Sequence, residues 1–130
     1  MSEKEPAGER PPYGTWCHVE IGADDVARAK KFYGDCFGWT FRDIPEMEYA
    51  LYETGEGGIG GGMMKRNENM PRQMVNYAFV EDVEASAKRV EECGGAVVME
   101  KTEVPGAGWF SVVSDPEGNV FGIWQGMGKG

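Results

Sequence analysis

The chain has 130 residues, with 13 Lys and Arg against 22 Asp and Glu, so its formal net charge is −9. That length is typical of one domain with its own core, and the acidic excess repels nucleic acid and anionic membrane surfaces. We therefore expect neither as a partner. No apolar stretch is long enough for a membrane-spanning helix, and the polar, proline-bearing residues 1–12 predict a flexible tail rather than a signal sequence.

The first half of the chain predicts the order strand, helix, strand, strand, strand. Residues 13–21 alternate loosely and favour a strand. Asp24 or Asp25 then caps a helix over 26–36, which Gly38 ends. The apolar face of this helix consists of Val26, Ala29, Phe32 and Tyr33. Three short strands separated by turn residues are expected over 39–44, 49–54 and 59–65.

The second half repeats this order after a linker at residues 66–72. Asp82 caps a helix expected over 83–93, and the strands of this half are expected over 74–80, 96–101, 109–114 and 119–125, before a short tail at 126–130. Asp25-Val26 returns as Asp82-Val83, and Cys36 returns as Cys93, an offset of 57 residues in both cases. Two modules, about 13–65 and 74–125, therefore form one domain over 13–125, and equivalent positions of the two can be compared.

The repeated order and its motifs together resemble the glyoxalase and bleomycin-resistance group, the vicinal oxygen chelate superfamily. The motifs are Phe32-Tyr33, Phe37-Gly38-Trp39, Val80-Glu81-Asp82-Val83, Cys93-Gly94-Gly95 and Asp115-Pro116-Glu117-Gly118. Within the superfamily, the element Pro105-Gly106, which precedes the last motif, resembles the corresponding element of small proteins related to lactoylglutathione lyase. The resemblance implies an α+β fold, in which two βαβββ modules form one curved mixed sheet around a cup with the helices on its convex side.

The resemblance also implies four positions that hold a divalent metal in the metal-dependent members. His18 matches the first of them, on the first strand. Its repeat counterpart is Val75, and Gly61 and Gly122 lie at or near the positions of the two glutamates. None of these three residues offers a ligand, and one imidazole does not retain a divalent ion. We therefore expect no cofactor and no four-ligand metal site.

His18 and Glu20 lie two residues apart on one strand, so they face the same side together with Trp16. One interpretation of His18 is a polar residue of the cup that bonds to Glu20 or a tyrosine. An alternative is a shifted metal site of His18 with Glu20 or Glu53. General acid or base candidates are His18, Glu20, Glu53 and Tyr77, and we take His18, Glu20 and Tyr77 as the catalytic set.

The cup is expected to be roomy and aromatic, which suits a flat organic ligand. Its expected lining is Trp16, His18, Glu20, Glu53, Gly61, Val75, Tyr77, Trp109, Gly122 and Trp124. Met63 and Met64 are expected to add pliable surface nearby. Three functions remain open: a binder of an aromatic or carbonyl compound, a metal-independent enzyme, or a metal-dependent lyase, isomerase or dioxygenase. For an enzyme, the resemblance implies an activity related to that of lactoylglutathione lyase.

The three cysteines are Cys17, Cys36 and Cys93, and they fall at no metal-binding spacing. They lie in apolar sequence surroundings that predict reduced thiols in the core, and reduced thiols indicate the cytosol. The number of aromatic residues for so small a domain favours a homodimer.

Overall fold

The computed structural model describes residues 11–68 and 73–127. Most of the two tails predicted at 1–12 and 126–130, and residues 69–72 of the predicted linker, lie outside the described residues. The chain divides into two compact units. The first unit is Trp16–Tyr77, and the second unit comprises Met1–Thr15 and Ala78–Gly130.

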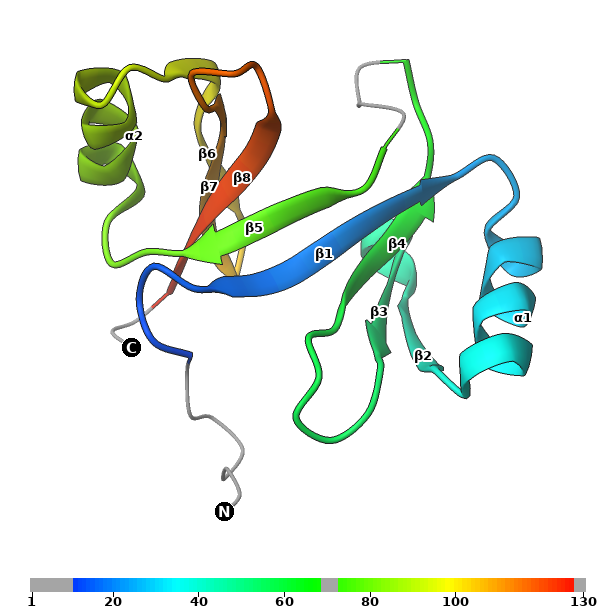
Figure 1. Cartoon of the computed structure of the whole chain (residues 1–130). Coiled ribbons are helices and arrows are strands. Elements are labelled where there is room, and N and C mark those ends of the chain that lie inside the picture. The colour runs from blue at the N-terminus through cyan, green and yellow to red at the C-terminus, as the bar shows by residue number, and fades with distance from the viewer. Residues whose placement is uncertain (1–10, 69–72, 128–130) are drawn as a thin grey trace. The chain divides into compact units, whose positions relative to one another are not determined.

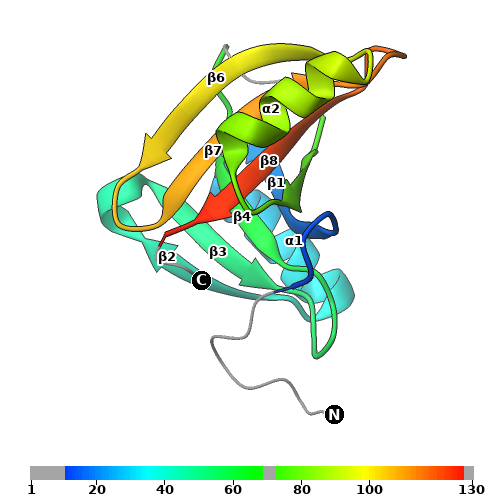
Figure 2. The same cartoon turned by 90° about the vertical axis from the view of Figure 1, so that its left-hand side faces the viewer.

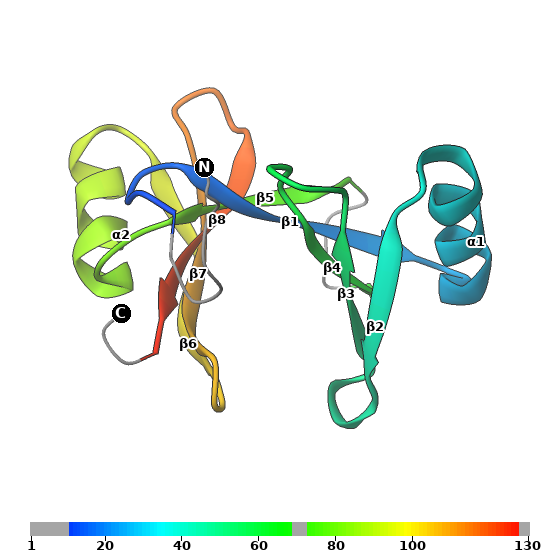
Figure 3. The ribbon, with the colours of Figure 1, turned by 90° about the horizontal axis from the view of Figure 1, so that it is seen from below.

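The first unit contains the first βαβββ module and the start of one further strand. Its elements are β1 (Trp16–Ala23), α1 (Val26–Phe37), β2 (Thr40–Ile44), the short 3-10 helix Pro45–Met47, β3 (Tyr49–Glu53), β4 (Gly61–Lys65) and the start of β5 (Val75–Phe79). The strands lie in the order β2-β3-β4-β1, with β5 next to β1. β1 and β4 run parallel, whereas β4 with β3 and β3 with β2 are antiparallel, and β4, β3 and β2 are seen side by side in Figure 3.

Local sequence signals fix both ends of α1. The side chain of Asp25 accepts a hydrogen bond from the backbone N–H of Arg28 at 3.0 Å, as an N-cap does. Gly38 adopts a left-handed conformation with φ 77°, and its N–H donates to the carbonyl of Gly34 at 2.9 Å. Glycine adopts this conformation without a steric penalty. The predicted cap and stop are confirmed, and the helix extends one residue further than expected.

The core of the first unit lies between α1 and one face of its strands. Ile21, Tyr52 and Met63 are buried there, and Val26, Ala29, Tyr33, Trp39 and Phe41 pack against them. Tyr33 stacks on Trp39 with ring centroids 4.7 Å apart, and Trp39 stacks on Tyr52 at 5.0 Å. Phe32 was expected on the same apolar face of α1. It lies beside Ala29 and Tyr33 and meets the ring of Tyr33 edge-on, but it is 54% exposed and so lies at the margin of the core.

The second unit contains the end of β5 followed by α2 and an antiparallel set of strands. These elements are α2 (Val83–Glu92), β6 (Ala96–Val104), β7 (Gly108–Ser114) and β8 (Val120–Gly126), and β5 is followed along the sheet by β8, β7 and β6. Asp82 caps α2 by accepting from the N–H of Ala85 at 3.0 Å. Figure 2 shows α2 lying along β7 and β8, where Val83, Val113 and Ile123 form the buried cluster of this unit.

The eight strands and two helices form an α+β fold with an open, mixed sheet, which confirms the predicted fold class (Figure 1). Each module has the expected order βαβββ. A cup between the modules depends on the placement of one unit against the other, and it stays a prediction. Within the described residues, no helix is long and apolar enough to cross a membrane.

The cysteines differ from expectation. All three are free thiols, but Cys36 and Cys93 are exposed, because they lie near the ends of α1 and α2 on solvent-facing positions. Only Cys17, on β1, is partly buried, and burial raises the pKa of its thiol to about 11. The prediction of three core thiols is therefore wrong for two of them.

Candidate functional site

β1 places His18 and Glu20 on the face of the first unit that is turned away from α1. Side chains alternate along a strand, and Ile21 points into the core beneath α1. His18 and Glu20, at even positions of the same strand, therefore lie on the opposite face, as predicted. Both side chains are partly buried. They can therefore form hydrogen bonds that are only partly screened by water, and they can still be reached from solution.

The hydroxyl of Tyr49 joins these two side chains. It donates a hydrogen bond to Oε2 of Glu20 at 3.0 Å, and Nε2 of His18 lies 2.8 Å from the same oxygen. The imidazole and phenol rings are almost parallel, with an interplanar angle of 5° and centroids 6.5 Å apart. A ring nitrogen bonds in the plane of its ring, so this geometry is that of an in-plane hydrogen bond. The two functional residues of β1 are thus held by a residue of β3.

Tyr77 completes the cluster from β5. Its hydroxyl donates to Oε1 of Glu20 at 3.2 Å, so each carboxylate oxygen accepts one phenolic hydrogen bond. Its ring meets the imidazole of His18 edge-on, at 79° and 5.7 Å between centroids. The structure therefore brings together His18, Glu20 and Tyr77, the three residues predicted as a catalytic set. We refer to these three residues with Tyr49 as the polar cluster.

Gly62 makes room for Tyr49. It is the register partner of Glu20 in the parallel pair of β1 and β4, so it lies beside the polar cluster. A Cβ added at Gly62 would collide with the hydroxyl and ring carbons of Tyr49. The absence of a side chain at this position is what allows the phenol to reach between His18 and Glu20.

Burial sets the protonation of the polar cluster. It lowers the pKa of His18, so the imidazole is neutral at pH 7. Burial raises the pKa of Glu20, and the hydrogen bonds from Tyr49 and Tyr77 oppose that rise. Burial and the charge of Glu20 raise the pKa of both tyrosines well above the ordinary phenol value. Both hydroxyls therefore stay protonated and act as donors.

The raised pKa of Glu20 predicts a pH-dependent stability. A group whose pKa is higher in the folded state contributes stability that is present below its unfolded pKa and is lost as the pH rises through the folded pKa. We therefore expect the free energy of unfolding of the wild type, relative to Glu20→Gln, to decline as the pH rises from about 4 towards 7. Urea titrations at several pH values measure this difference.

The control for this pH series is Glu56→Gln, which changes an exposed carboxyl in the loop before β4. Its free energy of unfolding should follow the wild type across the series. A constant difference between wild type and Glu20→Gln would contradict the assignment of Glu20 as the carboxylate that burial destabilises.

The residues of the first unit do not fit a four-ligand metal site. Val75, the repeat counterpart of His18, is buried and offers no ligand. The hydroxyl of Tyr49 lies between His18 and Glu20, in contact with both. Across residues 11–68 and 73–127, no group of three or more His, Cys, Asp and Glu side chains is arranged to hold an ion. A divalent ion needs several converging ligands, and the residues around His18 do not supply them.

The other residues predicted for the lining lie at several places. Trp16, on the same face of β1 as His18, is 47% exposed. Glu53 is exposed at the end of β3. Gly61 pairs with Val19 and lies beside the backbone of that residue. By strand alternation, Gly61 is therefore on the α1 side, and Gly62 is the glycine beside the polar cluster.

The aromatic residues predicted from the last strands belong to the second unit. Trp109 packs against the buried cluster of Val83, Val113 and Ile123, so it faces α2 and not a ligand surface. Phe110, its neighbour, is the register partner of Trp124 and lies on the other face of the sheet. Gly122, also expected in the lining, pairs with Val112. The sequence-based lining is corrected at Trp109, where the expected face is off by one residue.

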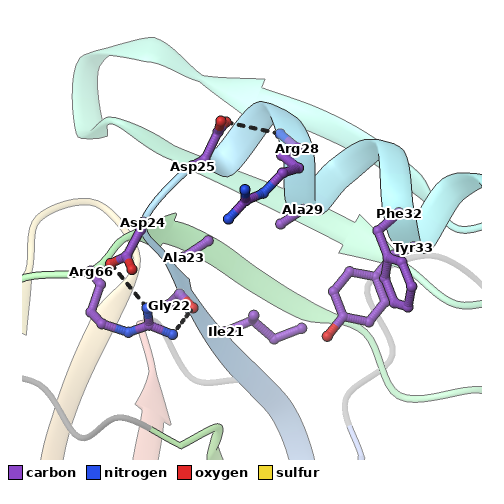
Figure 4. A pocket seen from close by; sticks show the side chains of 10 residues that line it. All are labelled: Ile21, Gly22, Ala23, Asp24, Asp25, Arg28, Ala29, Phe32, Tyr33 and Arg66. Carbon is purple, nitrogen blue, oxygen red and sulfur yellow. Dashed lines mark hydrogen bonds and ion pairs between the residues drawn. The ribbon is translucent and has the colours of Figure 1, made fainter.

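A separate pocket of about 410 Å³ lies at the start of α1 (Figure 4). It shares no residue with the polar cluster; its lining is Ile21, Gly22, Ala23, Asp24, Asp25, Arg28, Ala29, Phe32, Tyr33 and Arg66. Arg66 donates to the carbonyl of Gly22 at 2.9 Å and pairs with Asp24 at 3.0 Å. Asp25 is the N-cap of α1. Both acidic side chains thus have structural roles.

Comparison with known proteins places these features in a family. Residues 15–55 match the model of the bleomycin resistance protein-like N-terminal family. A glyoxylase-like domain-containing protein of Didymella fabae is 32% identical over 126 residues, which cover 90% of this chain and 98% of that protein. The anthracycline biosynthesis protein DnrV of Streptomyces peucetius is 28% identical over 123 residues, which cover 82% of this chain and 45% of DnrV. The chain thus spans less than half the length of DnrV.

Among solved structures, a glyoxalase/bleomycin resistance protein/dioxygenase superfamily member from Vibrio splendidus 12B01 has a TM-score of 0.62. It is 18% identical, and the similarity covers 87% of this chain and all of that one, 100%. At this identity the likeness concerns the fold alone.

Proposed function

Because this chain belongs to the glyoxalase and bleomycin-resistance superfamily, we propose that it binds a small aromatic or carbonyl-containing organic molecule at the polar cluster of the first unit. It does so as a binder or as a metal-independent enzyme. The observation that carries the proposal is a carboxylate, Glu20, held between two phenols beside a neutral imidazole, on a sheet face turned away from the core. A small number of polar groups that converge among aromatic rings is typical of sites for small organic ligands.

The charges of the polar cluster support a neutral or cationic ligand. Glu20 is the one acidic side chain of the four, none of them is a lysine or arginine, and the protein as a whole carries a formal charge of −9. An anionic ligand would meet this field without an opposing cation in the cluster. A carbonyl compound or a flat aromatic molecule can pack against the half-buried ring of Tyr49 and direct its polar group towards His18.

Metal-independent chemistry is the second part of the proposal. His18 is neutral at pH 7 and can accept a proton, which is what a general base needs at that pH. Of the positions that the superfamily's metal site would use, Val75 and Gly61 in the first unit carry no donor atom in their side chains. We therefore propose that the purified protein holds no stoichiometric transition metal. Elemental analysis showing about one equivalent of metal that His18→Ala removes would restore the metal-dependent lyase, isomerase or dioxygenase reading.

The test of ligand binding is a thermal-shift screen of aromatic, cationic and α-dicarbonyl compounds. A ligand that binds the folded state raises the melting temperature by mass action. We expect hits whose affinity falls about tenfold or more in Glu20→Gln and in Tyr77→Phe, since each variant removes one hydrogen bond within the site. Glu56→Gln, in an exposed loop, should bind as the wild type does. Hits with full affinity in both cluster variants would show that the site lies elsewhere.

Whether the protein converts a bound compound distinguishes an enzyme from a binder. A compound that is consumed, as followed by its NMR spectrum over time, identifies an enzyme, and a compound that is only held identifies a binder. We also propose a cytosolic location, which the free thiols favour, and a homodimer, which exposed apolar side chains such as Phe32 and Phe37 favour.

A further inference from the structure

The hydrogen bonds of Tyr49 determine which nitrogen of His18 carries a proton. A phenolic hydroxyl has a single proton, and that of Tyr49 is donated to Oε2 of Glu20. It has no second proton to give to His18, which lies 2.8 Å away. Nε2 of His18 must therefore be the donor in that contact. Only the tautomer with the proton on Nε2 satisfies both bonds at once.

Glu20 reinforces this direction. In its ionised form Glu20 has no proton to donate, and its other oxygen accepts a hydrogen bond from Tyr77 at 3.2 Å. Reversing the chain of bonds would leave Glu20 facing the lone pair of Tyr49. Two acceptors in contact in a partly buried site are costly, so the direction from His18 through Tyr49 to Glu20 is the stable one.

The second ring nitrogen of His18 is then a free acceptor. In the Nε2–H tautomer, Nδ1 carries a lone pair and no proton. Among the described residues it has no hydrogen-bond partner. The only fully buried side-chain polar atom without a partner in the described part of the chain is Nε of Arg66. Nδ1 of His18 is therefore reachable by solvent or by a ligand.

From this geometry we propose that Tyr49 is a positioning residue that fixes the Nε2–H tautomer of His18, so that the site selects ligands presenting a hydrogen-bond donor to Nδ1. The class is aromatic or carbonyl compounds that carry a hydroxyl or N–H group, such as phenols, enols and hydroxycarbonyls. A ligand offering only carbonyl or ether oxygens would place an acceptor against an acceptor. The selection of ligands rests on the proposed function, because it requires that a ligand binds. The tautomer of His18 does not depend on it.

The tautomer can be tested without any ligand. Protein labelled with ¹⁵N at histidine contains a single imidazole, because His18 is the only histidine in the chain. At pH 7.5 we expect its spectrum to show a protonated Nε2 and an unprotonated Nδ1. In Tyr49→Phe, which keeps the ring and removes the hydroxyl, we expect the two shifts to move towards the average of mixed tautomers. A protonated Nδ1 in the wild type, or an unchanged spectrum in Tyr49→Phe, would overturn the proposal.

Selectivity is tested with a matched pair of compounds, para-hydroxybenzaldehyde and para-methoxybenzaldehyde. The hydroxyl group of the first compound can donate a hydrogen bond, whereas the methoxy oxygen of the second can only accept one. We expect the hydroxyl compound to bind the wild type about tenfold more tightly by NMR titration, the worth of one hydrogen bond, and this preference to shrink in Tyr49→Phe. Equal affinities, or tighter binding of the methoxy compound, would refute the selectivity.

The two experiments separate failure of this inference from failure of the proposed function. If neither compound binds while the Nε2–H tautomer is observed, the positioning role of Tyr49 stands and the ligand class is wrong. If the compounds bind and the tautomer is Nδ1–H, the site exists and the role of Tyr49 is refuted.

Discussion

A Met63→Ala variant is expected to lose about 2–5 kcal/mol of its free energy of unfolding, the usual cost of a cavity left by a large core side chain. Met63 is fully buried, at 0% exposure, and packs with Ile21 and Tyr52 in the core of the first unit. The thioether packs beneath α1 among buried side chains, so alanine would leave a cavity there. Urea denaturation followed by far-ultraviolet circular dichroism measures the loss.

The matched control is Met64→Ala. Met64 is the next residue of β4 and, by strand alternation, lies on the opposite face, where it is only partly buried. Its truncation should cost clearly less than that of Met63. Equal losses for the two variants would mean that β4 does not present its odd-numbered residues to the core, and the placement of Gly62 beside the polar cluster would then also be wrong.

The helices and the strand β4 differ in how far the sequence predicts them. The helices were predictable, because Asp25 and Asp82 are caps and Gly38 and Gly94 can adopt the left-handed conformation that ends a helix. The faces of β4 were not, since a strand of five residues that begins with two glycines has too little alternation to indicate its buried side. Met63 was therefore expected to add pliable surface beside the cup, whereas it lies in the core.

The candidate site was predictable where it depends on one strand. The two-residue spacing of His18 and Glu20 places them together on β1, and the repeat points to the facing part of β5 with Tyr77. Tyr49 was missed, because its role depends on the register of β3 against β4 and on the space above Gly62. The available signal was the pair of adjacent glycines at 61–62, since glycine within a strand often marks the close approach of another group.

Trp109 shows the same limit in the second unit. One residue separates the two faces of a strand, so an error of one position in the expected face moves a side chain from the ligand surface to the core. The bulky neighbours Trp109 and Phe110 are both apolar, and composition alone does not tell which of them faces α2. The contact of Trp109 with the cluster around Val113 decides it.

A Gly62→Val variant is expected to displace the ring of Tyr49 and so disconnect His18 from Glu20. The new side chain would occupy the place of the phenol, whereas the extended backbone of β4 accepts valine without strain. Overpacking of this kind costs typically about 1–3 kcal/mol. Beyond the loss of stability, we expect the ¹⁵N spectrum of His18 to resemble that of Tyr49→Phe, because both changes remove the same hydroxyl from the imidazole.

A double-mutant cycle tests whether the collision between the valine side chain and the ring of Tyr49 causes the loss of stability in Gly62→Val. In Tyr49→Ala the ring is absent, so adding Gly62→Val to that background should cost much less than it does in the wild type, because the clash has no partner. Free energies of unfolding of the four proteins give the coupling directly. If the two changes simply add, Gly62 is not what holds the space for Tyr49, and the phenol must reach His18 and Glu20 for another reason. If they couple, the glycine of β4 and the tyrosine of β3 act as one structural unit, which holds the phenol between His18 and Glu20.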